Sequence, residues 1–154
     1  TVLLAEFGHS VHGAAISPAM IELARQNIPA AHPKVELWVM DAAFPIFQPQ
    51  QFDVIVCRHL LWALPEPDQG LHRWANLLKP GGRLILIEGY WHTDAGLHAQ
   101  DVINMLPATF EHVVVHTLSN QPELWGGKVT DERYAILAHY PINRPTTTEN
   151  QASP

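Results

Sequence analysis

The sequence predicts a doubly wound α/β fold with a mostly parallel sheet and an antiparallel last strand. First, strand-like and helix-like stretches alternate over most of the chain. Second, residues 52–57 and 83–88 are short, almost continuous apolar runs, which are typical of strands buried on both faces of a parallel sheet. Third, residues 111–118 and 132–140 are strand-like with no helix between them, which predicts an antiparallel pair at the sheet edge.

The chain begins with a helix–strand–helix pattern. Residues 2–7 have helical apolar spacing and are followed by Gly8, a residue that commonly follows helix ends. Residues 10–15 are short and apolar, which predicts a strand. Ser17 and Pro18 then begin a helix, because serine caps helix N-termini and proline suits the first helical position.

The middle of the chain continues the alternation. Residues 34–40 alternate between polar and apolar and predict a strand, and residues 41–51 form a proline-broken loop. An amphipathic helix is expected over residues 68–78, and the glycines of residues 80–82 predict a tight turn into the next strand. A further helix is expected from about residue 94 to residue 106.

The length of 154 residues is enough for one domain with one core, which we assign to residues 1–140. Residues 141–154 are polar and proline-rich and are expected to be a disordered tail. The net charge of −6 without any basic run argues against nucleic acid or an anionic membrane as a partner. No apolar stretch approaches the roughly 20 residues that span a bilayer. The oligomeric state cannot be read from the sequence.

The number and spacing of cysteines and histidines argue against disulfide bonds and metal sites. The single cysteine, Cys57, excludes an intramolecular disulfide and a cysteine zinc cluster, and fits a cytoplasmic location. Because Cys57 ends an apolar strand, we expect an inert thiol. The ten histidines are scattered without metal-ligand spacing, so no metal site is expected.

Three predicted strands end in residues that are suited to binding. Ala15-Ile16, Asp41-Ala42 and Arg58-His59 each follow the end of a predicted strand. Ligands in open α/β sheets bind beyond the carboxyl ends of the strands, so these residues are expected to line one crevice.

Four segments, in order, resemble class I S-adenosylmethionine-dependent methyltransferases of the small-molecule, bacterial type. They are EFGHSVHGAAISPAMIELARQ (6–26), VMDA (39–42), FDVIVCRHLLWALPEPDQGLHRWANLLKPGGRLILIEG (52–89) and LWGGKVTDERYAILA (124–138). The resemblance covers about residues 2–140. It implies a Rossmann-like sheet, S-adenosylmethionine as the cofactor and a small molecule as the methyl acceptor.

The resemblance also implies roles for individual residues. Asp41 matches an aspartate that accepts a hydrogen bond from the adenine amino group in this family. His59 is the first candidate for a general base, with Tyr90 and His92 behind it. The cofactor-binding residues that the resemblance implies are Ala15, Ile16, Met20, Asp41, Ala42 and Arg58.

Most of these residues have structural interpretations as well. Asp41 is also suited to capping the following turn, and Ile16 and Met20 to core packing. Arg58 is also suited to a surface ion pair, and His59 to a packed position. The tryptophans are expected to lie in the core or at its rim rather than around a substrate; they are Trp62, Trp74 and Trp91.

The sequence departs from the family pattern in two ways. The family's first strand and its glycine-rich loop are expected before Thr1, so we expect an N-terminally truncated domain whose strand at 11–14 does not pair with the strand at 53–57. The family's acidic residue after its second strand is replaced by Ala15, which cannot accept hydrogen bonds from the ribose.

Three functions remain open. The first is an incomplete methyltransferase, inactive as this chain alone, and the second is a degenerate, non-catalytic module for interactions, which Ala15 favours. The third, a nicotinamide-dependent oxidoreductase, shares the fold class, but the antiparallel ending and the residues after 52–57 argue against it.

Overall fold

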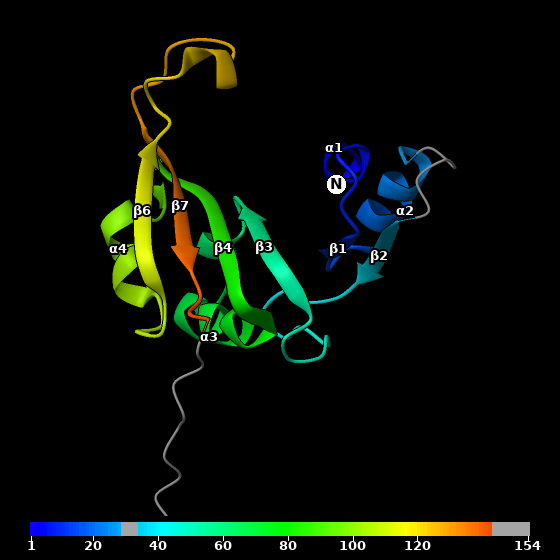
Figure 1. The fold of residues 1–154 in the computed structure, drawn as a ribbon. Coiled ribbons are helices and arrows are strands. Elements are labelled where there is room, and N and C mark those ends of the chain that lie inside the picture. The colour runs from blue at the N-terminus through cyan, green and yellow to red at the C-terminus, as the bar shows by residue number, and fades with distance from the viewer. Residues whose placement is uncertain (29–33, 143–154) are drawn as a thin grey trace, which may run out of the picture. The chain divides into compact units, whose positions relative to one another are not determined.

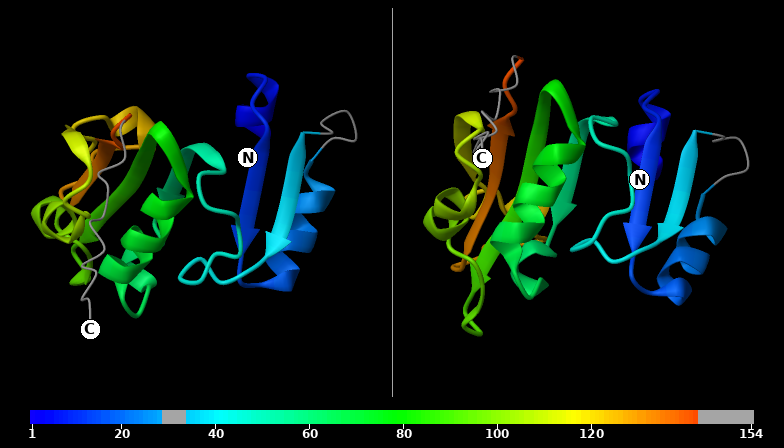
Figure 2. Two further views of the ribbon diagram at one scale, coloured as in Figure 1. Left: turned by 60° about the horizontal axis from the view of Figure 1, so that its bottom comes forward. Right: turned by 90° about the horizontal axis from the view of Figure 1, so that it is seen from below.

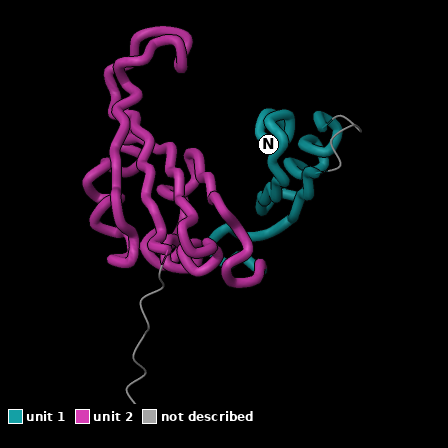
Figure 3. The backbone as a smooth tube through the Cα atoms, in the orientation of Figure 1, with its two compact units in different colours: residues 1–46 teal, residues 47–154 magenta. Residues whose placement is uncertain are grey.

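The computed structural model describes residues 1–28 and 34–142 of the chain. They fall into two compact units, residues 1–46 and residues 47–154 (Figure 3). The expected tail lies outside the described residues from residue 143 onwards. Each unit contains its own sheet, with two strands in the first and five in the second. The prediction that the strand at 11–14 does not pair with the strand at 53–57 is therefore confirmed.

The first unit is a strand–helix–strand motif preceded by a short helix. The elements are α1 (Val2–Glu6), β1 (Val11–Ala15), α2 (Pro18–Gln26) and β2 (Val35–Val39). The strands β1 and β2 are parallel, with Val11 opposite Val35 and Ala15 opposite Val39. Figure 2 shows α2 packed beside this pair.

The two helices of this unit begin and end at the predicted residues. Gly8 follows α1 with φ +91°, and its N–H donates to the carbonyl of Ala5. This left-handed conformation suits glycine, which has no Cβ to clash with the backbone. The backbone N–H of Met20 donates to the hydroxyl of Ser17 over 3.4 Å, so the predicted N-cap of α2 is confirmed.

The second unit is a mixed sheet in the order β3–β4–β7–β6, which Figure 1 shows side by side. The strand β3 (Phe52–Arg58) is parallel to β4 (Leu78–Trp91). The last two strands, β6 (Glu111–Thr117) and β7 (Glu132–His139), are antiparallel to each other, and β7 is antiparallel to β4. The predicted α/β class with an antiparallel last strand is confirmed.

Two helices pack on this sheet, α3 (Pro67–Leu77) and α4 (Ala99–Met105), and they contact each other. Buried side chains of α3, of α4 and of one sheet face form the core. They include Leu71, Trp74, Leu84, Leu86, Val102, Tyr134 and Ile136, all at most 5% exposed. Two one-turn 3-10 helices, η1 (Leu61–Ala63) and η2 (Pro122–Leu124), and the two-residue strand β5 (Ala95–Gly96) complete the unit.

Three local predictions were wrong. The strand β3 is not buried on both faces, because Val54 and Val56 are 40% and 48% exposed. Its alternate side chains face away from the buried side of the sheet, and among the described strands β3 pairs with β4 alone. The expected helix from residue 94 begins only at Ala99, since β5 turns back to pair with β4. The turn at residues 80–82 lies within β4, as a register shift against β3.

Candidate functional site

Five of the predicted site residues lie at one edge of the first unit. Ala15 ends β1, and Asp41 comes two residues after the end of β2. The N–H of Met40 donates to the carbonyl of Ala15 over 2.9 Å, which holds the two strand ends together. Ile16 precedes the N-cap of α2, and Met20 lies in its first turn. Parallel strands thus bring residues far apart in the sequence to one edge.

The side chains at this edge are open to solvent. Ile16 is 71% and Met20 is 63% exposed, so the interpretation of both as core residues is wrong. One carboxylate oxygen of Asp41, Oδ1, accepts a hydrogen bond from the N–H of Ala43 over 2.8 Å. The capping interpretation of Asp41 is therefore confirmed, and it leaves Oδ2 on an exposed side chain. Ala42 lies between the two residues of this turn.

The remaining two predicted residues lie at the carboxyl end of β3 in the second unit. Arg58 is exposed, and no carboxylate among the described residues pairs with it, so the expected surface ion pair is not observed. His59 has a left-handed backbone with φ 51°, and its N–H donates to the carbonyl of Ile87 over 2.9 Å. Such a conformation is uncommon outside glycine and is held here by the neighbouring strand.

The imidazole of His59 is partly buried. Its ring centroid lies 5.3 Å from that of Trp91, and Nδ1 is buried with no hydrogen-bond partner among the described residues. Burial lowers the pKa of His59, and the positive charges of Arg58 and Arg133 lower it further. The imidazole is therefore neutral near pH 7, as a general base must be before it takes a proton.

Glu88 is a residue that the sequence analysis did not single out. It is fully buried near the end of β4. Its Oε1 accepts hydrogen bonds from the N–H of Leu60 over 2.9 Å and of Leu61 over 2.8 Å. Its Oε2 is buried with no partner among the described residues. The available signal was a glutamate inside an otherwise apolar strand, since buried carboxylates are rare unless they are paired.

The carboxylate of Glu88 fixes the loop that carries His59. Leu60 and Leu61 begin the one-turn helix η1, whose backbone N–H groups need acceptors. Burial raises the pKa of Glu88 above its usual 4.5, although the hydrogen bonds from Leu61 and Leu60 oppose this shift. The nearby Cys57 is buried, and burial together with Glu88 raises the pKa of its thiol to about 12, in line with the expected inert cysteine.

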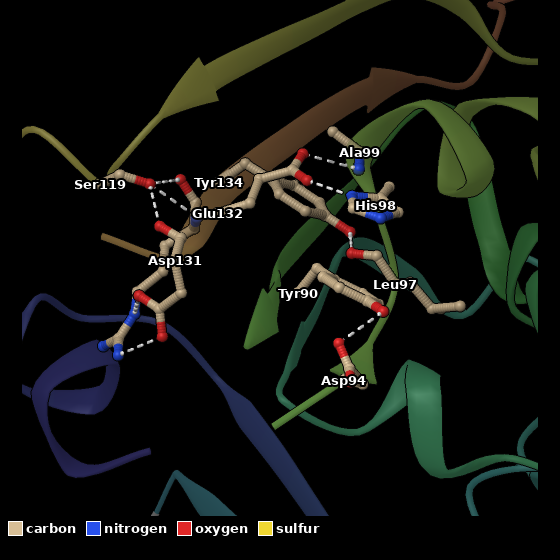
Figure 4. Close-up of polar contacts among 10 residues, drawn as sticks. Tyr90, Asp94, Leu97, His98, Ala99, Ser119, Asp131, Glu132 and Tyr134 are labelled. Atoms are coloured by element: carbon tan, nitrogen blue, oxygen red, sulfur yellow. Dashed lines mark hydrogen bonds and ion pairs between the residues drawn. The ribbon is translucent and has the colours of Figure 1, made fainter. Parts of the chain in front are cut away.

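A second polar cluster lies where β4, β5 and β7 meet (Figure 4). Nδ1 of His98 lies 2.6 Å from one carboxylate oxygen of Glu132, and the N–H of Ala99 donates to the other oxygen over 3.0 Å. The ring of Tyr90 stacks on His98 at 4.0 Å between centroids, and its hydroxyl lies 3.4 Å from Asp94. Glu132 therefore supplies an acceptor at the start of α4. The sequence analysis named Tyr90 as a candidate base but missed its neighbours, because Glu132, which holds His98 and Ala99, is more than 30 residues away in the chain.

Asp131 and Arg133 form a two-bond ion pair beside this cluster. The guanidinium of Arg133 donates to Oδ1 of Asp131 over 2.9 Å and to Oδ2 over 3.1 Å. The side chain of Asp131 is 2% exposed and that of Arg133 is 19% exposed. The hydrogen bonds from Arg133 hold the pKa of Asp131 below its usual 3.8.

We expect Asp131→Asn to lower the free energy of unfolding by about 1.5–3 kcal/mol at pH 7, the range for hydrogen bonds to charged groups. Since its folded pKa is depressed, Asp131 stabilises the fold above its unfolded pKa, and this contribution is lost as the pH falls below about 4. Urea denaturation at pH 7 and at pH 3 measures both effects. Asp53→Asn is the control, because its 2.8 Å pair with Lys79 is solvent-exposed and contributes about 0–1 kcal/mol. Equal losses in both variants would contradict this assignment.

Within residues 1–28 and 34–142, no helix has the length and apolar character needed to cross a bilayer. In the same part of the chain, no group of three or more histidine, cysteine, aspartate or glutamate side chains is placed to hold a metal ion.

Comparison with known sequences gives a family match and several relatives. A family model described as "Methyltransferase domain" matches residues 1–86. The chain is 30% identical over 110 residues to the ubiquinone biosynthesis O-methyltransferase of Coxiella burnetii (strain RSA 493 / Nine Mile phase I), covering 68% of this chain and 46% of that protein. It is 29% identical over 126 residues to the aklanonic acid methyltransferase DauC of Streptomyces sp. (strain C5), covering 80% and 54%. The chain thus spans about half the length of these relatives.

Solved structures share the fold. The chain is similar to a SAM-dependent methyltransferase of Methanosarcina mazei, with a TM-score of 0.71, 18% identity and coverage of 92% of this chain and 86% of that one. It is also similar to the phosphoethanolamine N-methyltransferase 2 of Haemonchus contortus, with a TM-score of 0.73, 17% identity and coverage of 89% and 44%. The [4+2]-cyclase SpnF reaches a TM-score of 0.74 at 19% identity, covering 92% and 71%. The fold alone therefore does not decide the reaction.

Proposed function

Because the chain belongs to the class I S-adenosylmethionine-dependent methyltransferase family, we propose that the protein containing it transfers a methyl group to a small molecule. The family match over residues 1–86 carries this proposal. That region contains the three strand ends at which the predicted cofactor-binding residues and His59 lie.

The edge of the first unit fits the adenine half of S-adenosylmethionine. Ile16 and Met20 offer exposed apolar surface to a flat ring, and the exposed carboxylate of Asp41 is suited to accept a hydrogen bond from the adenine amino group. Ala42 follows Asp41 at the same edge. We propose these four residues and Ala15 as cofactor-binding residues of the first unit, and, separately, Arg58 as a cofactor-binding residue of the second unit.

S-adenosylmethionine, when bound, supplies an already activated methyl group, so the protein's main task is to position the acceptor. The name of one relative, the ubiquinone biosynthesis O-methyltransferase, specifies an oxygen as the methyl acceptor. The name of another, the aklanonic acid methyltransferase, specifies an acid as the substrate. We therefore infer an oxygen acceptor. His59 is our candidate for the base that takes the acceptor's proton, since its pKa is lowered and it follows the carboxyl end of β3.

We propose a cytoplasmic protein with no nucleic acid or membrane partner. The net charge of −6 and the single, buried cysteine support this proposal.

A titration of the full-length protein that contains this chain with S-adenosylhomocysteine tests the proposed function directly. We expect Asp41→Ala to weaken the binding of S-adenosylhomocysteine about five- to tenfold, because an acceptor of a hydrogen bond is lost. His59→Ala should change this affinity less, because His59 is assigned to the acceptor. Isothermal calorimetry on both variants measures the difference. A larger loss for His59→Ala would reverse the two assignments, and the absence of any binding to the wild-type protein would refute the function.

Ala15 favours a second candidate function, a non-catalytic module for interactions. The resemblance to the family implies a carboxylate at this position, and the side chain of Ala15 offers the ribose no hydrogen-bond acceptor. Absence of S-adenosylhomocysteine binding in a folded protein would support this alternative.

A further inference from the structure

Two histidines at the ends of segment 92–98 face two consecutive carboxylates at the start of β7. The Nδ1 atom of His92 lies 3.6 Å from Oδ2 of Asp131. The Nδ1 atom of His98 lies 2.6 Å from Oε2 of Glu132, as Figure 4 shows. Since the segment contains β5 and follows β4, these contacts join both of its ends to β7.

The carboxylate of Glu132 holds more than the imidazole of His98. Its Oε1 accepts a hydrogen bond from the N–H of Ala99 over 3.0 Å. Ala99 is the first residue of α4, and His98, at the N-cap position, makes no capping hydrogen bond with its own side chain. Glu132 therefore supplies the acceptor that an N-cap side chain usually provides. One carboxylate thus joins β7, the 92–98 segment and the start of α4.

The imidazole of His98 is positioned by its surroundings. The ring of Tyr90 stacks on it at 4.0 Å between centroids, with 21° between the ring planes. The hydroxyl of Tyr90 lies 3.4 Å from Oδ1 of Asp94. The hydroxyl of Tyr134 donates to the carbonyl of Leu97 over 2.7 Å, which fixes the backbone beside His98. The pair with Glu132 therefore forms without ordering a freely rotating side chain.

Negative charge predominates on the elements that meet at this pair. Besides Glu132, three carboxylates lie on the 92–98 segment, on the first turn of α4 and just before β7; they are Asp94, Asp101 and Asp131. The guanidinium of Arg133 is bound to both oxygens of Asp131. The buried carboxylate of Glu88 accepts its hydrogen bonds from the loop at η1. A proton on His98 thus adds positive charge where carboxylates outnumber the guanidinium.

We propose that His98 and Glu132 form a proton-dependent latch that holds the 92–98 segment and the start of α4 on β7. When His98 carries a proton on both ring nitrogens, its hydrogen bond to Glu132 is also an ion pair, so it is stronger than the bond that a neutral imidazole donates. Histidine changes charge between about pH 5 and pH 8. The latch is therefore tight at the acidic end of this range and loosens as the pH rises.

The latch acts on a segment that follows the carboxyl end of β4. Ligands of open α/β sheets bind at this edge, so the latch couples the pH to the mobility of the chain there. The proposal concerns the fold of the second unit and does not depend on the proposed methyltransferase function.

Hydrogen–deuterium exchange of the full-length protein that contains this chain tests the latch. The reporters are the backbone amides of Leu97 and Ala99, which donate to Gly89 and to Glu132. After correction for the intrinsic pH dependence of exchange, we expect about three- to fivefold more protection at about pH 5.5 than at about pH 8. The expected effect is modest because the side chains of His98 and Glu132 are 52% and 38% exposed, and solvent screens such a pair.

Three variants separate the latch from other effects of pH. Glu132→Gln keeps an oxygen for the N–H of Ala99 but removes the negative charge, so its protection should be the same at both pH values. His98→Gln should lose the pH dependence as well. His92→Gln is the matched control, because His92 is 78% exposed and lies 3.6 Å from its carboxylate, and this variant should keep the pH dependence. Circular dichroism confirms that each variant is folded.

Equal protection of the wild-type protein at both pH values would overturn the proposal, and so would a pH dependence that survives Glu132→Gln. Loss of the pH dependence in His92→Gln together with its retention in His98→Gln would also overturn it, because the effect would then belong to His92 and Asp131.

Discussion

Replacing Glu88 by alanine is expected to lower the free energy of unfolding by about 2–4 kcal/mol. The change leaves the N–H groups of Leu60 and Leu61 without their acceptor, and an unsatisfied buried donor costs roughly 1–3 kcal/mol. Removing the buried Cγ methylene costs roughly 0.8 kcal/mol more. Relief of the buried carboxylate's desolvation offsets part of this loss. Denaturant unfolding of the purified variant measures the total, which is large against a typical net stability of about 5–15 kcal/mol.

Glu88→Gln is the matched control, since the amide oxygen can still accept from both N–H groups. We expect its cost to stay near 1 kcal/mol. The difference in the free energy of unfolding between Glu88→Gln and the wild type should also depend on pH. The folded pKa of Glu88 is raised, so the wild-type protein loses stability relative to Glu88→Gln as the pH rises from about 4.5 through that folded pKa. A loss below 1 kcal/mol for Glu88→Ala would show that Glu88 does not anchor the loop.

In the full-length protein that contains this chain, replacing Ala15 by aspartate is expected to tighten the binding of S-adenosylhomocysteine about ten- to a hundredfold. The two ribose hydroxyls can donate to the two oxygens of a carboxylate, and a hydrogen bond to a charged acceptor contributes roughly 1.5–3 kcal/mol. Ala15 is at the end of β1, beside the exposed residue Ile16. Calorimetry with S-adenosylhomocysteine and with its 2′-deoxy analogue measures the effect, and the deoxy analogue should gain much less.

Ala14→Asp provides a control of equal charge. Successive side chains of a strand point to opposite faces, so residue 14 faces away from the side on which residue 15 lies. This variant should leave the affinity for S-adenosylhomocysteine unchanged. If Ala15→Asp gives no gain in affinity and lowers the thermal midpoint, the new carboxylate has been placed without a partner. That result would favour the non-catalytic module.

The sequence predicted the class of the fold well, because helix ends and apolar runs are local signals. Gly8 and Ser17 end and begin their helices where expected, since each meets a local backbone requirement. The burial of β3 was predicted wrongly for a reason outside the strand itself. An apolar run predicts a strand, but the burial of Val54 and Val56 depends on which elements pack against each face.

The sequence predicted those parts of the candidate site that depend on neighbouring residues, and it missed the contacts between residues that are far apart in the chain. Residues that directly follow a strand, such as Ile16 and Asp41, can be placed from the sequence, because strand ends share an edge. Glu88 is 28 residues from Leu60 and 27 residues from Leu61, from whose N–H groups it accepts hydrogen bonds. Glu132 is 34 residues from His98. Such pairs depend on strand register, which no local pattern specifies.

The thiol of Cys57 can be used to measure local opening of the second unit. It is the chain's one cysteine, it is buried, and its thiol pKa is raised to about 12. The thiol is therefore protonated at pH 7 in the folded state, and alkylating reagents attack the thiolate. The rate of alkylation consequently measures how often β3 and β4 separate from the core, and it reports on the same strands that hold the loop of His59.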